Sequence, residues 1–263
     1  MTESPSAPSS QVAPVEHPAG HGLLAGKGVL VTAAAGSGIG SATARRCLEE
    51  GARVVIADKH ERRLAETTTE LGVPGIVCDV TDESSVQAMV INAAEMLGGI
   101  DVLVNNAGLG GTAEVHEMTD AQWAVVLDVT LTGTFRVTRA ALNHMYPLGR
   151  GVIVNNSSVL GWRAQAGQAH YAAAKAGVMA FTRCSAIEAA PRGVRINAVA
   201  PSLAMHANLA KVTSDELLAE LTSREAFGRA AEPWEIANVI VFLASDLSAY
   251  MTGEVISVSS QHP

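Results

Sequence analysis

Short apolar runs alternate with amphipathic stretches from about residue 27 to the end of the chain. The runs rich in valine and isoleucine are expected to be strands, at residues 29–32, 53–57, 76–78, 101–105, 151–155, 194–199 and 254–258. Helical patterns lie between or after them, at residues 39–50, 60–71, 83–97, 121–145, 168–190, 214–222 and 233–244. This alternation is typical of right-handed βαβ units. It predicts an α/β fold, a doubly wound parallel seven-stranded sheet with helices on both faces, in a single domain.

Two stretches differ in composition from this pattern. Residues 1–22 are rich in serine, proline and alanine and lack the charged and apolar regions of a signal peptide, so they are expected to form a flexible N-terminal arm. The domain is expected to cover residues 23–263. Within it, the stretch from about 202 to 229 is rich in alanine and leucine. That composition indicates a mobile lid over an apolar substrate.

Composition narrows the classes of partner. The chain is 48% hydrophobic and 17% charged, with a net charge of −8, so it has no basic stripe to neutralise nucleic-acid phosphates. No apolar run reaches the length that crosses a membrane. Cys47, Cys78 and Cys184 lack the spacing of a disulfide framework or a metal site. We therefore expect buried free thiols in a cytoplasmic protein, with no bound metal.

A glycine-rich turn, residues 32–40, joins the first strand to the first helix. Glycines there let backbone N–H groups approach a pyrophosphate at the helix N-terminus. The residues expected to contact a dinucleotide in this turn are Gly36, Ser37, Gly38, Ile39 and Gly40.

Asp58 stands at the end of the second strand, twenty residues beyond Gly38. A carboxylate in that position accepts hydrogen bonds from the adenosine ribose diol and repels a 2′-phosphate. The turn and Asp58 together predict a Rossmann-type dinucleotide site that prefers NAD over NADP, although Lys59 and His60 would partly offset the carboxylate. Asp79, after the third strand, is open to two interpretations: it hydrogen-bonds an adenine amino group, or it shapes the turn before the next helix.

Tyr171 and Lys175 lie four positions apart in an alanine-rich helical run, with Ser158 upstream. Residues four apart share one face of a helix, so the phenol and the ammonium are expected to point the same way. A nearby ammonium favours the phenolate and is expected to lower the pKa of the tyrosine. This arrangement predicts an acid/base group for an alcohol or ketone, whose oxygen a serine hydroxyl could hold.

Two further motifs follow strands: Asn-Asn-Ala-Gly at residues 105–108 and Asn-Ala-Val-Ala-Pro at residues 197–201. With the glycine turn and the Ser158, Tyr171 and Lys175 set, they make the chain resemble the short-chain dehydrogenase/reductase family, in its compact single-domain branch, from about residue 26 to 258. The resemblance implies that Tyr171 is the general acid/base, that Ser158 positions the substrate oxygen, and that Lys175 lowers the tyrosine pKa and binds the nicotinamide ribose. Cofactor contacts are also implied for Val80, Asn106, Ala107, Gly108, Tyr171, Lys175, Pro201 and Leu203.

The chain departs from the family pattern at several positions. The first glycine of the turn is replaced within Ala33-Ala34-Ala35, which is compatible with the turn if that residue avoids positive φ. Thr130 stands where the family has a catalytic asparagine, so its hydroxyl or a freed carbonyl is expected to hold the proton-relay water. His206 stands where a threonine binds the carboxamide, and it could bind that group or the substrate. The C-terminal residues 258–263 differ from the usual Asp-Gly-Gly ending.

The expected substrate is apolar. Trp162 and Arg163 follow Ser158, and an aromatic plate with a cation would suit a bulky ketone that carries an anionic tail; a surface salt bridge is the other interpretation of Arg163. The sequence of residues 160–165 and of residues 261–263 resembles that of bacterial dehydrogenases of steroid-ring catabolism, which act on CoA-linked alcohols.

The leading hypothesis is an NAD(P)-dependent enzyme that interconverts a secondary alcohol and a ketone, as a homodimer or homotetramer built on the long helices. One alternative is an NADPH-dependent 3-oxoacyl reductase, against which Asp58 argues. A distant alternative is a non-catalytic dinucleotide-binding protein. Double-bond reduction is disfavoured, because enoyl reductases of this fold place six residues between the tyrosine and the lysine.

Overall fold

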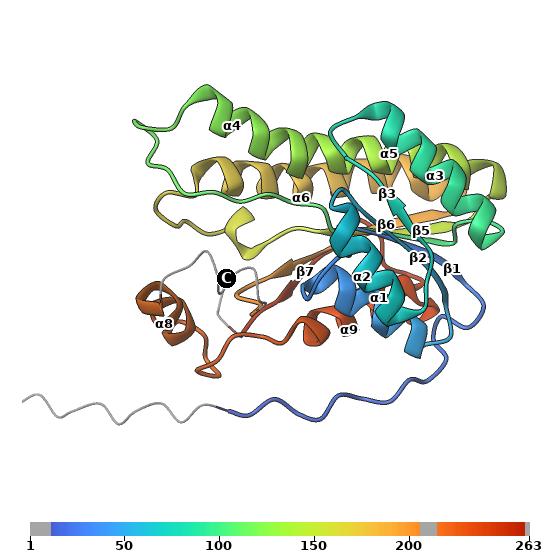
Figure 1. The fold of residues 1–263 in the computed structure, drawn as a ribbon, viewed down its shortest axis with the longest axis horizontal. Coiled ribbons are helices and arrows are strands. Elements are labelled where there is room, and N and C mark those ends of the chain that lie inside the picture. The colour runs from blue at the N-terminus through green and yellow to red at the C-terminus, as the bar shows by residue number, and fades with distance from the viewer. Residues whose placement is uncertain (1–11, 206–214, 261–263) are drawn as a thin grey trace, which may run out of the picture.

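Seven parallel strands form one sheet in the computed structural model, which describes residues 12–205 and 215–260 (Figure 1). The strand order is β3-β2-β1-β4-β5-β6-β7, so the chain first builds outward from β1 and then crosses to β4 on its other side. The strands are β1 (Gly28–Thr32), β2 (Arg53–Asp58), β3 (Gly75–Val77), β4 (Val102–Asn105), β5 (Gly151–Asn156), β6 (Val194–Pro201) and β7 (Val255–Val258). The predicted doubly wound, single-domain fold is confirmed.

Helices cover both faces of the sheet, as Figure 1 shows. One layer contains α3 (Glu83–Leu97), α4 (Asp120–Leu127), α5 (Gly133–Met145) and α6 (Ala169–Ala189); the other contains α1 (Ile39–Glu49), α2 (Glu61–Leu71) and α9 (Pro233–Ala244). Alternate strand residues supply the two cores: Val29 and Val31 face α1 and α9, whereas Leu30 and Leu103 face α3 and α5. Among the described residues, no helix is both long and apolar enough to cross a membrane.

The helix expected over residues 121–145 is interrupted. Asp128–Thr132 form a π-helical turn, η1, between α4 and α5. Thr130 lies inside that turn, and its carbonyl accepts a hydrogen bond from the Thr134 hydroxyl at 2.8 Å. A π turn adds one residue to a helix without changing its apolar pattern much, so the periodicity could not reveal it.

The expected flexible arm is partly ordered against the domain. Val12 N donates to Phe227 O at 3.0 Å, and His17 contacts both Glu49, at 2.8 Å, and the edge of the Trp234 ring. Further along, the backbone N–H groups of residues 21 and 23 both donate to the buried Glu50 carboxylate. This segment therefore lies against its own chain, because Glu49 and Glu50 at the end of α1 bind it and Trp234 of α9 packs on His17.

The expected lid contains α8 (Asp215–Ser223), followed by a turn whose ends are fixed. Arg229 binds Glu235 with both guanidinium nitrogens at 2.7 Å and donates from Nε to Val12 O at 2.8 Å. One cysteine differs from expectation: Cys184 is exposed on α6, whereas Cys47 and Cys78 are buried.

Candidate active site

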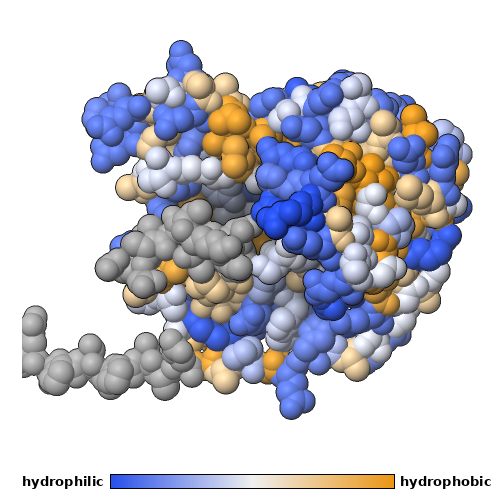
Figure 2. Space-filling view, viewed as in Figure 1, coloured by the Kyte–Doolittle hydropathy of each residue, from blue (hydrophilic) through white to orange (hydrophobic). Residues whose placement is uncertain are grey.

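A cavity of about 500 Å³ opens where the carboxyl ends of β1, β2, β4, β5 and β6 meet. It extends from Asp58 at one end to Ser158, Tyr171 and Lys175 at the other. In the orientation of Figure 1, the surface is hollowed beside the end of the molecule that carries α4 (Figure 2). This is the crevice in which open α/β sheets bind their ligands.

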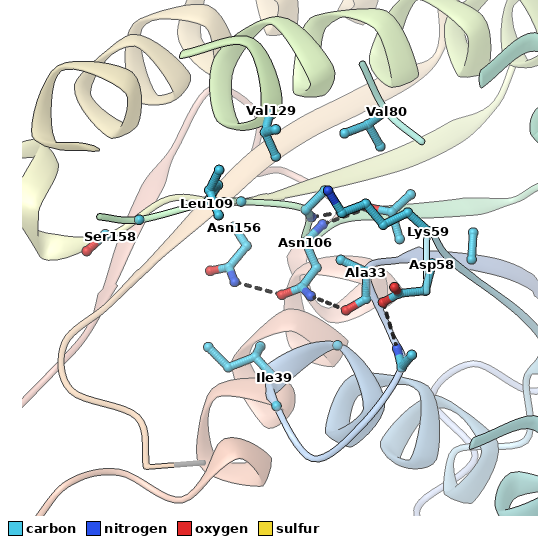
Figure 3. A pocket seen from close by; sticks show the side chains of 18 of the residues that line it. Ala33, Ile39, Asp58, Lys59, Val80, Asn106, Leu109, Val129, Asn156 and Ser158 are labelled. Atoms are coloured by element: carbon cyan, nitrogen blue, oxygen red, sulfur yellow. Dashed lines mark hydrogen bonds between the residues drawn. The ribbon is translucent and has the colours of Figure 1, made fainter. Parts of the chain in front are cut away.

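The glycine turn lies at the floor of this cavity, in a conformation that costs the protein strain. Ala33 has a φ of +49°, so the condition under which alanine would fit without strain is not met. The strained carbonyl is held in place because Asn106 Nδ2 donates to Ala33 O at 2.9 Å (Figure 3). Gly40 must be glycine, since a Cβ there would lie 2.5 Å from both of these atoms.

Gly38 is a glycine for a different reason. Its φ of −90° is open to any residue, and a Cβ built there meets no protein atom within 4 Å. The protein itself therefore does not require a glycine here. The open space over Gly38 leaves room for a group to approach the backbone at the N-terminus of α1, as the predicted pyrophosphate contact requires.

Asp58 binds the turn from the end of β2. Its Oδ2 accepts from Ala35 N at 3.2 Å and its Oδ1 from His60 N at 2.9 Å (Figure 3). A carboxylate accepts more than one hydrogen bond per oxygen, so capacity remains for a ribose diol. Lys59 and Arg63 line the same end of the cavity.

Two roles were expected for Asp79, contact with an adenine group or shaping the turn before the next helix, and its hydrogen bonds show that it shapes the turn. Its Oδ1 accepts from Thr81 N at 2.9 Å and from Thr81 Oγ1 at 2.8 Å. These two hydrogen bonds lower the pKa of Asp79. Asp79 and Val80 also line the cavity, so the carboxylate can shape the turn and still contact an adenine group.

Ser158, Tyr171 and Lys175 come together at the other end. Ser158 follows β5 and starts the short helix η3 (Val159–Gly161), where its hydroxyl accepts from Leu160 N at 3.2 Å; it also hydrogen-bonds the Tyr171 phenol. Lys175 Nζ lies 5.6 Å from the centre of the Tyr171 ring, as the spacing predicts. Ser157 points elsewhere and donates to Lys175 O at 2.9 Å.

The charge states of this pair differ from the simple expectation. Burial raises the pKa of Tyr171, and the hydrogen bond from Ser158 offsets only part of that shift. Burial also lowers the pKa of Lys175 to about 8. The ammonium donates to Asn156 O at 2.6 Å rather than to the phenol. Desolvation is the largest cause of both shifts, so the pKa of Tyr171 lies above its usual value in the protein alone and not below it, as the sequence predicted.

The Thr130 hydroxyl already has hydrogen-bond partners in the protein. The hydroxyl donates to Leu109 O at 3.2 Å and accepts from Leu109 N at 3.0 Å, and the residue is 0% exposed. The Thr130 hydroxyl therefore fixes the loop after β4 and has no further proton to donate, while the expectation that this hydroxyl or a freed carbonyl holds a relay water stays a prediction. Gly108 in that loop lies against Lys175, because a Cβ there would be 3.3 Å from Nζ.

Asn156 is a site residue that the sequence reasoning missed. Its Nδ2 donates to Asn106 Oδ1 at 2.8 Å, which continues the chain of hydrogen bonds to Ala33 O (Figure 3). Its Oδ1 is buried without a partner at the cavity wall, as is His170 Nδ1 next to Tyr171. The signal was available, since a strand of apolar residues ends in two consecutive asparagines.

Two residues of the turn, Gly36 and Ser37, are not among the described residues that line the cavity; Gly36 N instead donates to Thr67 Oγ1 at 3.0 Å. The other predicted residues divide into three groups. Pro201 and Leu203 line the cavity, as do Ile39, Asn106, Ala107 and Gly108. Trp162, 45% exposed, and Arg163 are not among the described residues that line it. His206 lies outside the described residues. The described part of the chain contains no group of three or more His, Cys, Asp or Glu side chains that could hold a metal ion.

Comparisons with known proteins agree with this geometry. Residues 33–260 match the profile of a family described as enoyl-(acyl carrier protein) reductase. The chain is 65% identical over 260 residues to (5R,7aS)-5-hydroxy-7a-methyl-1-oxo-2,3,5,6,7,7a-hexahydro-1H-indene-carboxyl-CoA reductase of Mycobacterium tuberculosis, covering 96% of this chain and 98% of the relative. It is 43% identical over 235 residues to cis-4-hydroxycyclohexanecarboxylate dehydrogenase of Sinomonas cyclohexanicum, covering 88% and 94%.

A solved structure shows the same fold. The crystal structure of a short-chain dehydrogenase from Mycobacterium smegmatis is 58% identical, with a TM-score of 0.85, over 95% of this chain and 98% of that one. The family resemblance proposed from the motifs is thereby confirmed. The chain belongs to the short-chain dehydrogenase/reductase family, whose NAD(P)-dependent oxidoreductases act on secondary alcohols and ketones.

Proposed function

We propose that the protein is an NAD-dependent enzyme that interconverts a ring alcohol and a ring ketone on an apolar carboxylic acid carried as its CoA thioester. The observation that carries this proposal is the Ser158, Tyr171 and Lys175 set at the end of a dinucleotide-shaped cavity. The substrate class follows the two relatives, whose names describe a hydroxy-indene-carboxyl-CoA and a hydroxycyclohexanecarboxylate.

The residues divide the work as follows. A nicotinamide ring, when bound, would supply the hydride chemistry, and its oxidised form would bring a positive charge into the site. Ser158 holds the substrate oxygen, and Tyr171 takes the hydroxyl proton during oxidation or returns it during reduction. Because burial raises the pKa of Tyr171 in the protein alone, the phenolate depends on that added charge and on the Lys175 ammonium.

Cofactor preference is proposed from the adenosine end. The Asp58 carboxylate accepts hydrogen bonds from a ribose diol and repels a 2′-phosphate, although Lys59 and Arg63 line the same end. We expect NADH to bind more tightly than NADPH when the two are titrated side by side. Replacement of Asp58 by serine should narrow the difference, because the repelling charge is removed.

Assembly and location belong to the same proposal. Free cysteines fit a reducing cytoplasm, and the exposed apolar side chains of α4, α5 and α6 fit a homodimer or homotetramer. No nucleic acid is needed by this chemistry.

The decisive test removes the phenol hydroxyl. Tyr171→Phe is expected to lower turnover of a cyclic hydroxy acid thioester by at least about 100-fold while NADH still binds, because the proton acceptor is lost and the cavity is not. Tyr146→Phe is the matched control, since Tyr146 stacks on Arg192 just after α5 and does not line the cavity. Near-normal turnover in Tyr171→Phe would contradict the assignment.

The CoA part of the proposal is tested separately. The same ring alcohol is offered as the free acid and as the CoA thioester, with NADH formation as the readout. A higher kcat/KM for the thioester supports recognition of CoA. Equal kcat/KM values for the two forms would mean that the enzyme recognises the ring alcohol and not the CoA group.

A further inference from the structure

Glu225 is a buried carboxylate outside the catalytic set. It lies in the turn after α8 and is 4% exposed. Burial of a carboxylate is costly unless hydrogen-bond donors replace its water. Its Oε2 accepts from Ser260 Oγ at 2.7 Å, and its Oε1 accepts from Leu203 N at 3.4 Å. The carboxylate therefore joins two segments that are far apart in the sequence.

The first segment is a wall of the cavity. Residues 201–204 line it together with Ser158 and Tyr171. They follow β6, which pairs with β5 so that Val199 lies opposite Asn156, and Ser157 N donates to Val199 O at 2.8 Å. Because Ser158 directly follows Ser157 after the end of β5, this wall stands at the Ser158 and Tyr171 end of the cavity and not at the Asp58 end.

The second segment follows β7. Ser260 O accepts from Ala226 N at 3.1 Å, and Val258 O accepts from Ser202 N at 3.2 Å. Behind the wall, Ala231 N donates to Leu203 O at 2.8 Å and Met205 N donates to Ala231 O at 3.0 Å. The wall, the turn after α8 and the residues after β7 thus form one hydrogen-bonded unit, and the Glu225 side chain touches two of its three parts.

We propose that Glu225 is a positioning residue for the nicotinamide end of the cofactor. It fixes the main chain at Leu203, which sets how far the wall stands from Ser158 and Tyr171. The proposal rests on the family's use of a nicotinamide cofactor, and it is independent of which alcohol the enzyme oxidises.

The test compares the binding affinities of two ligands, NADH and ADP, that share the adenosine diphosphate part. NADH carries the nicotinamide riboside, whereas ADP has only the adenosine and diphosphate that reach the Asp58 end. Glu225→Ala is expected to weaken NADH binding by about tenfold and leave ADP binding unchanged, because a lost hydrogen bond with a charged group has effects of this order. Should the protein prefer NADPH, the pair becomes NADPH and 2′,5′-ADP.

Two variants make the comparison specific. Glu225→Gln keeps an oxygen acceptor for Leu203 N and should recover most of the NADH affinity. Glu220→Ala removes an acid of α8 that pairs with Arg224 on the surface, and it should change neither ligand. In a double-mutant cycle, Glu225→Ala and Ser260→Ala should be non-additive in NADH affinity, because they remove the same contact.

Equal weakening of NADH and ADP, or no change in either, would overturn the proposal. Unchanged ADP binding also shows that the variant is folded. If Glu225→Ala does not fold, Ser260→Ala carries the test and should give a smaller loss confined to NADH. No alcohol or ketone is present in these titrations, so a wrong substrate assignment would not affect the result.

Discussion

At the scale of single residues, burial is the largest influence on the pKa values of Tyr171 and Lys175. Lys175 is enclosed in the protein, and its ammonium is directed to the carbonyl of Asn156. Loss of water lowers its pKa from 10.5 to about 8, whereas the same loss raises the pKa of Tyr171. Above about pH 8 the site is therefore less charged than the same two side chains would be in water.

This shift predicts a pH dependence of stability. Between pH 8 and 10.5 the unfolded chain keeps the Lys175 proton that the folded chain has released, so the stability contributed by this group rises with pH by up to about 3 kcal/mol. Below pH 8 both states are protonated and the contribution is constant. Lys175→Met should abolish this rise, so the difference in Tm between wild type and variant should change between pH 7.5 and 10. A difference that stays constant across this range would contradict the assigned pKa.

At the scale of elements, the π turn η1 and the loop after β4 support each other. Thr130 bonds both the N–H and the C=O of Leu109, and the neighbouring Gly108 leaves room for Lys175. A substitution at Thr130 can therefore displace the loop of residues 108 and 109 and so alter the surroundings of Lys175.

Thr130→Val tests this coupling, because it keeps the shape and removes both hydrogen bonds. We expect a loss of about 1–3 kcal/mol in the free energy of unfolding, since two backbone groups of Leu109 lose their partner, together with a lower kcat. Thr69→Val is the control: this exposed threonine on α2 bonds only the carbonyl four residues earlier. Unfolding in urea and steady-state kinetics measure the two effects, and equal behaviour of both variants would refute the coupling.

The elements could be predicted wherever an apolar pattern creates them. The ranges 83–97 and 233–244 agree with α3 and α9 at both ends. Tertiary hydrogen bonds escaped prediction: β6 runs on to Pro201 because it pairs with β7, and Asn156 joins the site through Asn106. Motif spacing predicted that Ser158, Tyr171 and Lys175 lie together, whereas the pKa shifts of Tyr171 and Lys175 depend on burial, which one sequence does not display.

At the scale of the whole molecule, apolar side chains remain exposed on the layer of α4, α5 and α6. They include Trp123, Val125, Phe135 and Ile187, the last 76% exposed. Phe135 on α5 meets Phe181 on α6 edge to face, with 6.2 Å between ring centres, so the two helices present one continuous surface. An exposed apolar surface of this kind indicates a protein interface.

A second copy of the chain is the expected occupant of this surface. Phe135→Glu and Ile187→Glu, singly or together, should reduce the molar mass in solution, because a buried charge without a partner opposes association. Leu247→Glu is the control, since Leu247 is similarly exposed and lies just after α9, a helix of the other layer. Light scattering coupled to size-exclusion chromatography gives the masses, and an unchanged mass for both variants would exclude this interface.

The turn at residues 225–229 also has a consequence for how the enzyme is made. The partner of Arg229 in this turn is Val12, which lies 217 positions earlier and is synthesised first. The partner of the Glu225 carboxylate is Ser260, which lies 35 positions later. During synthesis, β1 to β6 have already left the ribosome when residue 225 emerges. The wall of residues 201–204 therefore acquires its hydrogen bond to Glu225 in final form only after residue 260 has emerged, so a nascent chain can form the Asp58 end of the cavity before it completes the end that holds Ser158 and Tyr171.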